Sequence, residues 1–184
     1  MNTTQLIIDV YNTYGKITIE EDINQLEHAI QCAKFATDSK ASNDLIIASL
    51  LHDIGQLPPI EFGLDLKIES NDYGNIGHEY IGVQILKHLG FNNNIIDLVE
   101  NHVNAKRYLM YKNKKYKLSK ASQITLEQQG GIMTYDEYLE FKEKSNYKDI
   151  IKLRYWDDKA KIIDYDVPPI ESYRNLIINE LKMN

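Results

Sequence analysis

Apolar residues recur along most of the chain at the three- and four-residue spacing of amphipathic helices. No stretch shows a convincing alternation of apolar and polar residues, the pattern typical of a half-buried strand. The segment 104–117 stays open between a loop and an extended conformation. We therefore expect an all-α fold, with helices over 3–14, 22–38, 44–53, 78–89, 95–102, 118–128, 135–142, 147–160 and 168–183.

The helix expected over 44–53 is apolar on nearly every side, through the run Leu45–Leu51. A helix without a polar face belongs in the interior of a fold, so we expect this one to be central and buried. Asn43 is placed to cap its start, and Gly55 is placed to help end it. The last two residues of this helix, His52 and Asp53, both carry side chains that can bind a metal ion.

Length and composition are ordinary for one domain, with 184 residues, 43% hydrophobic and 26% charged. A net charge of −6 argues against a general nucleic-acid binder, and no apolar run approaches the ~20 residues of a membrane span. Cys32 is the single cysteine, which excludes an internal disulfide and fits a reducing compartment. We expect a cytoplasmic protein, a monomer or weak homo-oligomer, folded as one domain over 1–184 with its core at 21–161 and the C-terminal helix 168–183 packed on it.

Three of the five histidines fall at positions predicted to be buried, and a fourth opens a helix after a glycine-rich loop, while His88 alone resembles a surface residue. A lone histidine on an apolar face is more often a hydrogen-bonded core residue than a metal ligand. Several of them around a His-Asp pair favour a shared site, because each buried imidazole needs a partner. The four are His28, His52, His78 and His102.

Imidazole and carboxylate ligands without an available cysteine suit iron, manganese, cobalt or zinc. A bridging carboxylate from Asp53 could hold two ions together, and one more carboxylate should come from late in the chain. Asp157 is preferred because it shares a helical face with Leu153 and Arg154. Asp158 is the alternative, although it is more simply a surface acid that pairs with a lysine.

Basic and hydroxyl side chains lie one helical turn from the expected ligands, which favours an anionic substrate. Arg154 precedes the late carboxylate by one turn, and Lys106 follows a predicted ligand by one turn if its helix continues. Ser122 and Thr125 are also one turn apart. Such groups can bind the oxygens of an anion, while a solvated lysine and a surface serine are the simpler alternatives for Lys106 and Ser122.

Four local motifs resemble one family. They are Q-L-E-H-x-x-Q-C-A at 25–33, L-L-H-D-I-G at 50–55, T-L-x-x-Q-G-G at 125–131 and R-x-W-D-D-x-A-K at 154–161. The histidine and aspartate pattern resembles the HD-domain superfamily of helical proteins, and the four motifs together resemble its phosphonate-degrading di-iron oxygenases. The resemblance spans about 21–161.

This resemblance implies a mixed-valent pair of iron ions (Fe2+/Fe3+). One iron would be held by His28, His52 and Asp157, the other by His78 and His102, with Asp53 bridging them. It also implies that O2 is used to cleave the carbon–phosphorus bond of a small 1-hydroxyalkylphosphonate, such as 2-amino-1-hydroxyethylphosphonate, giving phosphate and a carboxylic acid such as glycine. The implied phosphonate contacts are Lys106, Ser122, Thr125 and Arg154.

The chain departs from the family pattern at two positions that face substrate or oxygen. Gln56 stands where the family usually has a second histidine, and Thr18 stands where it has a tyrosine that works with a glutamate, here Glu21. Tyr14 could replace that tyrosine if the loop is shifted. Gln56 can donate and accept hydrogen bonds but cannot shuttle a proton as histidine can, so a substrate with a different amine end, such as a methylated ammonium, is plausible.

Two other functions remain open. A metal-dependent phosphohydrolase acting on a nucleotide or phosphate ester would use the same basic and hydroxyl side chains, with a metal-bound hydroxide attacking phosphorus. A ligand-binding module without catalysis is the other alternative, but the intact ligand set argues against it. The motifs around Gln25, Thr125 and Arg154 favour the oxygenase.

Overall fold

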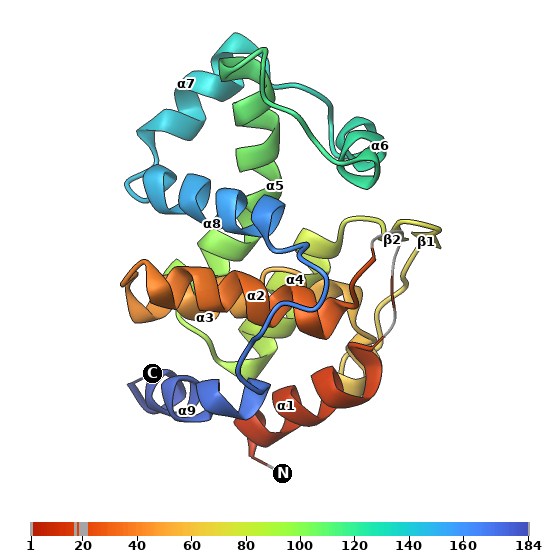
Figure 1. Cartoon of the computed structure of the whole chain (residues 1–184), viewed down its shortest axis with the longest axis vertical. Helices are drawn as coiled ribbons and strands as arrows, with labels where there is room; N and C mark the ends of the chain where they lie inside the picture. Colours follow the sequence, from red (N-terminus) through yellow and green to blue (C-terminus); the bar gives the residue numbers. More distant parts are fainter. Residues whose placement is uncertain (1, 17, 19–21, 184) are drawn as a thin grey trace.

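The computed structural model describes residues 2–16, 18 and 22–183, and helices make up most of it (Figure 1). The α-helices are α1 (Thr3–Tyr14), α2 (Gln25–Asp38), α3 (Asn43–Leu51), α4 (His78–Leu89), α5 (Asn93–Lys112), α6 (Lys120–Gln128), α7 (Tyr135–Glu143), α8 (Tyr147–Lys159) and α9 (Arg174–Met183). Short 3-10 helices are η1 (Ile54–Gln56), η2 (Pro59–Phe62) and η3 (Ile170–Tyr173). Within the described part of the chain, the one sheet is a hairpin of β1 (Ser70–Asn71) and β2 (Gly74–Asn75), which pair antiparallel. The predicted all-α class is confirmed.

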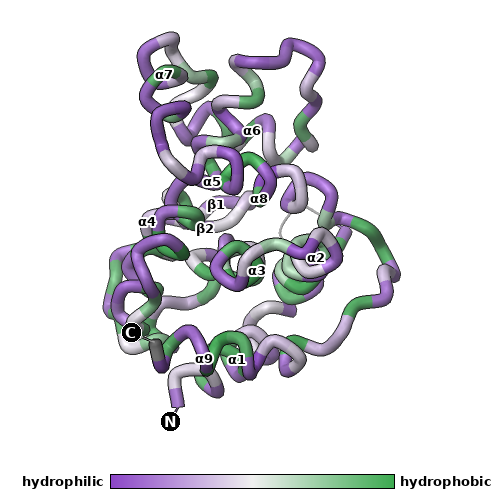
Figure 2. Tube along the Cα trace, turned by 90° about the vertical axis from the view of Figure 1, so that its left-hand side faces the viewer, coloured by the Kyte–Doolittle hydropathy of each residue, from purple (hydrophilic) through white to green (hydrophobic). Residues whose placement is uncertain are grey.

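Helix α3 is the central element, and every residue from Leu45 to Leu51 is buried. It packs against α2, α5 and α8, and also contacts α9. Figure 2 shows apolar residues concentrated on α3 in the middle of the molecule, whereas polar residues dominate the outer loops near α6 and α7. The prediction of a buried central helix is therefore confirmed.

The ends of α3 differ from the prediction. Ser42 caps the helix, accepting a hydrogen bond from the Leu45 N–H at 3.4 Å, and the expected cap Asn43 is the first helical residue. The helix ends at Leu51, so His52 and Asp53 lie in the turn that follows it. Leaving the helix lets the two adjacent side chains approach one site, which consecutive residues of a regular helix cannot do.

Gly55 has a different role from the helix end that was predicted. A Cβ atom on Gly55 would lie only 1.9 Å from the backbone oxygen of His78 and 2.7 Å from the amide nitrogen of Gly82. The absence of a side chain therefore lets η1 contact the first turn of α4 backbone to backbone. This contact brings His78 close to the turn after α3.

The boundaries of helices α2 and α5 also differ from the prediction. Helix α2 begins at Gln25 rather than residue 22, because Asn24 and Glu27 form a reciprocal capping box. Helix α5 continues to Lys112, since the buried Ala105 and Leu109 extend its inner face through the segment left open. Its alternating tyrosines and lysines had obscured that periodicity.

The buried side chains of α1, α3, α5, α8 and η3 belong to one continuous hydrophobic cluster. The terminal helices α1 and α9 contact each other and α3, below α2 in Figure 1. The domain boundaries 1–184 and 21–161 stay predictions. None of the helices described here combines the length and apolar character needed to cross a lipid bilayer.

Candidate metal and anion site

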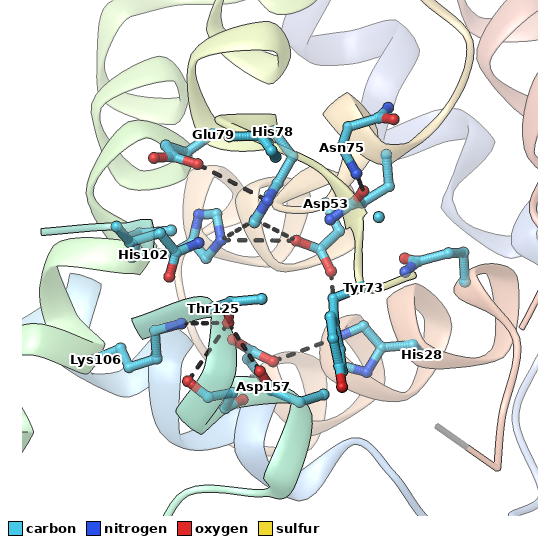
Figure 3. Close-up of a pocket in the computed structure, with 18 of the residues that line it drawn as sticks. His28, Asp53, Tyr73, Asn75, His78, Glu79, His102, Lys106, Thr125 and Asp157 are labelled. Atoms are coloured by element: carbon cyan, nitrogen blue, oxygen red, sulfur yellow. Dashed lines mark hydrogen bonds and ion pairs between the residues drawn. The ribbon is translucent and has the colours of Figure 1, made fainter. Parts of the chain in front are cut away.

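A cavity of about 350 Å³ opens beside the turn that follows α3. Its walls come from α2, η1, the β1–β2 hairpin, α4, α5, α6 and α8, as the close-up in Figure 3 shows in part. Elements that lie far apart in the sequence therefore converge on one space. Five of the six predicted metal ligands line it: His28, Asp53, His78, His102 and Asp157, while His52 lies buried directly behind them.

The first group of side chains surrounds the Nε2 atom of His28. That atom lies 3.1 Å from the Nε2 of His52 and 3.3 Å from Oδ1 of Asp157. Oδ2 of Asp53 lies 3.8 Å from it. Two imidazole nitrogens and two carboxylate oxygens thus face a common point between α2, α8 and the turn after α3.

The second group joins the start of α4 to the middle of α5. The Nε2 atoms of His78 and His102 lie 3.2 Å apart. Oδ1 of Asp53 lies 3.3 Å from the first and 3.6 Å from the second. Asp53 therefore presents one carboxylate oxygen to each group of ligands, which is the arrangement expected of a bridging carboxylate.

Backbone carbonyls set the tautomers of three histidines, and these tautomers indicate whether the side chains could bind a metal. Nδ1 lies 2.7 Å from the Ala160 oxygen in His28, 2.9 Å from the Ser49 oxygen in His52 and 2.6 Å from the Val99 oxygen in His102. A carbonyl oxygen only accepts, so each Nδ1 must donate, and a neutral ring then has a lone pair on Nε2. These Nε2 atoms point at neighbouring nitrogens and carboxylates. Such a set of converging lone pairs fits a bound cation.

Electrostatics favour ionised carboxylates at the same place, but the imidazoles differ. Burial lowers the pKa of His52 and His102, whereas the neighbouring carboxylates outweigh burial and raise the pKa of His28 and His78. Burial, together with the nearby His78 and His52, lowers the pKa of His102 to about 3. Burial opposes ionisation of Asp53, but the neighbouring His52 and His78 hold its pKa well below the usual value. Arg154 has the same effect on the buried Asp157, whose pKa is also well below its usual value.

The predicted substrate contacts lie together on the opposite wall of the cavity. Lys106 donates a hydrogen bond to the Thr125 hydroxyl at 3.0 Å, and Arg154 donates to the Ser122 hydroxyl at 3.4 Å. Lys106 is only 3% exposed, so the alternative of a solvated lysine is wrong. Ser122 is buried as well, which excludes a surface serine.

The positive charges on this wall are incompletely matched by the protein. No ion pair of Lys106 occurs within the part of the chain that the structure describes. The buried Nε of Arg154 likewise has no hydrogen-bond acceptor there. Burying an ammonium without an ion pair, or a guanidinium N–H without an acceptor, is costly. An anion in the cavity would supply the missing charge partner of Lys106.

Gln56 lines the cavity, but its side chain also holds the hairpin in place. Its Oε1 accepts a hydrogen bond from the backbone N–H of Asn75 at 2.7 Å. Tyr73, at the turn of this hairpin, projects its ring in front of His28 in Figure 3. No sequence signal indicated Tyr73, because the segment 58–76 resembled an ordinary loop.

The predicted residues of the first connector are placed only in part. Glu21 lies outside the described residues. Thr18 forms an isolated bridge with Asn24 and is exposed. The hydroxyl of Tyr14 donates to Glu61 at 2.7 Å, and Tyr14 is not among the residues that line the cavity.

Asp158 was the predicted alternative to Asp157, whereas Glu79 was not predicted to take part in the site. Asp158 accepts hydrogen bonds from Arg154 and Tyr116, so it helps to hold the guanidinium in place. The adjacent acids Asp157 and Asp158 thus have separate neighbours, and only Asp157 lies against the imidazoles. Glu79 is buried beside His78 (Figure 3). Nothing in the sequence around Glu79 distinguishes it from a solvated acid at the start of a helix.

Comparison with known proteins agrees with this arrangement. The family model described as HD domain matches residues 25–153. An uncharacterized protein of Acanthamoeba polyphaga mimivirus is 39% identical over 178 residues, covering 95% of this chain and 80% of that protein.

Two further relatives carry functional names. The protein named hydroxymethylphosphonate dioxygenase from Gimesia maris is 37% identical over 171 residues, 91% of this chain and 82% of its own. The protein of Leisingera caerulea named [1-hydroxy-2-(trimethylamino)ethyl]phosphonate dioxygenase (glycine-betaine-forming) is 37% identical over 170 residues, 91% of this chain and 84% of its own. The chain therefore belongs to the HD-domain family and, within it, to the phosphonate dioxygenases, a family of oxidoreductases.

Proposed function

We propose that this chain is a di-iron oxygenase that uses O2 to cleave the carbon–phosphorus bond of a small 1-hydroxyalkylphosphonate. The reaction balances as R–CH(OH)–PO3²⁻ + O2 → R–COO⁻ + HPO4²⁻ + H⁺. The hydroxyl-bearing carbon loses its hydrogen and its bond to phosphorus, and O2 takes up all four electrons. No external reductant is therefore required.

The single observation that supports this proposal most is Asp53 between two groups of imidazoles, in a cavity that also contains the buried Lys106, which has no ion pair among the described residues. His28, His52 and Asp157 would hold one iron, and His78 and His102 the other. The iron pair supplies the redox chemistry that activates O2 and the substrate when it is bound. Calcium and magnesium are disfavoured by a ligand set dominated by imidazole.

Lys106 and Arg154 would bind the phosphonate oxygens, with the hydroxyls of Ser122 and Thr125 as further partners. Arg154 is oriented for this by Asp157 at 2.7 Å and by Asp158. This cradle of basic and hydroxyl side chains would hold the phosphonate on one wall of the cavity, and the Asp53 carboxylate lies on another wall. The hydroxyl-bearing carbon would then lie between the cradle and the bridging carboxylate.

The substituent R would extend toward the hairpin, where Gln56, Tyr73 and Asn75 line the cavity. The two named relatives act on phosphonates with different substituents, hydrogen in one and a trimethylammonium group in the other. We propose that Gln56 acts at this end of the substrate and that Glu21 has a catalytic role. We also propose that the protein works in the cytoplasm as a monomer or weak homo-oligomer.

The proposal is tested with protein purified without oxygen, loaded with iron and offered three hydroxyphosphonates under oxygen. The substrates are hydroxymethylphosphonate, 2-amino-1-hydroxyethylphosphonate and its trimethylammonium analogue. We expect a mixed-valent di-iron signal in electron paramagnetic resonance that a substrate perturbs. We also expect release of phosphate with consumption of one O2 per phosphate.

An alternative outcome would identify a phosphohydrolase. In that case zinc- or manganese-loaded protein would hydrolyse a nucleotide or phosphate ester at the same rate with and without O2. The variant Arg154→Ala serves as a check on the cradle, because it should raise the KM for substrate while the iron content stays unchanged. Loss of iron from this variant would place Arg154 among the groups that hold the metal.

A further inference from the structure

One of the four clustered imidazoles is oriented differently from the others. His28, His52 and His102 each direct Nδ1 at a backbone carbonyl within 2.9 Å. His78 makes no such bond among the described residues, and the nearest acceptor given for its Nδ1 is Oε2 of Glu79 at 3.8 Å. Glu79 follows His78 directly in the first turn of α4, and Figure 3 shows the two side chains next to each other.

Glu79 is itself an unusual carboxylate. It is 5% exposed, and Oε2 has no hydrogen-bond donor within the described chain. A buried carboxylate oxygen without a donor is costly, so its location calls for a partner. The His78 Nδ1 is the only basic nitrogen in ion-pair distance of Glu79 among the residues described.

We propose that Glu79 is a positioning residue that accepts the Nδ1 proton of His78 and so directs the Nε2 lone pair of His78 toward the second metal. Carboxylate–histidine–metal arrangements of this kind fix the imidazole tautomer and raise its basicity as a ligand. A small movement of either side chain would close the 3.8 Å separation when a cation draws on Nε2. This inference rests on the proposed two-metal site.

A simpler role for Glu79 is to stabilise the start of α4, where an acid interacts favourably with the free N–H groups of the first turn. That role predicts a small loss of folding stability and no change in metal affinity. Asp136 is a matched control, since it is an exposed acid in the first turn of α7. Asp136→Asn removes a helix-terminal charge without touching the site.

The test is anaerobic titration of the metal-free protein with Fe2+, followed by calorimetry, for wild type and four variants. The variants are Glu79→Gln, His78→Ala, the double variant, and Asp136→Asn. We expect wild type and Asp136→Asn to bind two equivalents with the same affinities. Glu79→Gln should weaken one equivalent by about 10- to 100-fold and leave the other unchanged.

The double variant tells whether Glu79 acts through His78. If it does, adding Glu79→Gln to His78→Ala changes the affinities no further, because the group being positioned is already absent. Glu79→Asp is a second variant that keeps the charge at the helix start but withdraws the carboxylate, and it should lose affinity while melting like wild type. It decides the question if Glu79→Gln fails to fold.

The inference is overturned if Glu79→Gln and Glu79→Asp bind both equivalents as wild type does. It is also overturned if Glu79→Gln weakens the equivalent that remains in His78→Ala, since its effect would then not pass through His78. A wild-type protein that binds fewer than two equivalents would contradict the two-metal function itself. The two kinds of failure are therefore distinguishable.

Discussion

Lys106 carries a charge that the folded protein solvates poorly. Burial and the neighbouring Arg154 lower its pKa to about 7. The charged form is then fully present below pH 7 and is lost as the pH rises through that value. Because the unfolded chain keeps this proton up to an ordinary lysine pKa, Lys106 makes the substrate-free protein more stable as the pH rises from about 7 to 10.

Substrate capture should show the opposite dependence on pH. We expect kcat/KM for a hydroxyphosphonate to fall above about pH 7, because that ratio reports the ionisation of the free enzyme. Lys106→Arg should move the fall to higher pH, since a guanidinium remains charged. The exposed Lys112→Arg is the control on the same helix. Identical pH profiles for Lys106→Arg and wild type would exclude Lys106 from phosphonate binding.

At the level of elements, the β1–β2 hairpin is joined to the turn after α3 by Gln56. Besides the bond between Gln56 and Asn75, the Asn75 side chain donates to the Gly55 oxygen at 2.9 Å. Gly74 has a φ of +104°, and a Cβ there would lie 2.4 Å from Oε1 of Gln56. The hairpin and the Gln56 side chain therefore fit together only with glycine at this position.

Gly74→Ala should alter substrate selectivity more than metal binding. The substitution forces a positive φ on alanine, at a cost of about 1–2 kcal/mol, and displaces Gln56 from the cavity wall. Gly63→Ala carries a similar backbone cost at φ +84° but has only the exposed His88 within 4 Å. The measurement is the ratio of kcat/KM for hydroxymethylphosphonate to that for its trimethylammonium relative. An equal change of this ratio in both variants would mean that the hairpin does not contact the substituent.

For the whole molecule, the predicted metal ligands come from parts of the chain that are otherwise held together by apolar packing. His28 comes from α2, His78 from α4, His102 from α5 and Asp157 from α8. A ligand that binds only the folded state stabilises it in proportion to its affinity and concentration. Bound metal should therefore contribute directly to the stability of the domain.

Removal of metal by a chelator should lower the melting temperature. At a free metal concentration of about 100 times Kd, each site contributes roughly 2.7 kcal/mol, equivalent to roughly 5 to 11 °C for a chain of this length. His102→Ala should lose much of this shift, whereas His88→Ala, at an exposed position outside the site, should keep it. If neither the chelator nor His102→Ala changes the melting temperature, the folded core does not bind metal.

The order of helices, the buried central helix and the choice of His28, His52, His78 and His102 as a set could all be predicted from the sequence. The reason is that each depends on local periodicity or on a spacing of residue types that a helix preserves. The motif resemblance added the pairing of those histidines with Asp53 and Asp157, whose roles as ligands remain predictions. Helix caps were less predictable. Ser42 and Asn43 are adjacent and both are good capping residues, so the sequence does not show at which of them the helix begins.

Only the tertiary structure decided what each polar side chain faces. The burial of Lys106, the separate surroundings of Asp157 and Asp158, and the contact of Gln56 with Asn75 depend on segments far apart in the chain. Glu79 is the clearest case, since nothing in the sequence around it distinguishes a solvated helix-start acid from a buried one. Burial and the direction of a side chain follow from the packing of several elements at once. The sequence alone therefore determined which residues could make the site, and the fold decided how each one contributes to it.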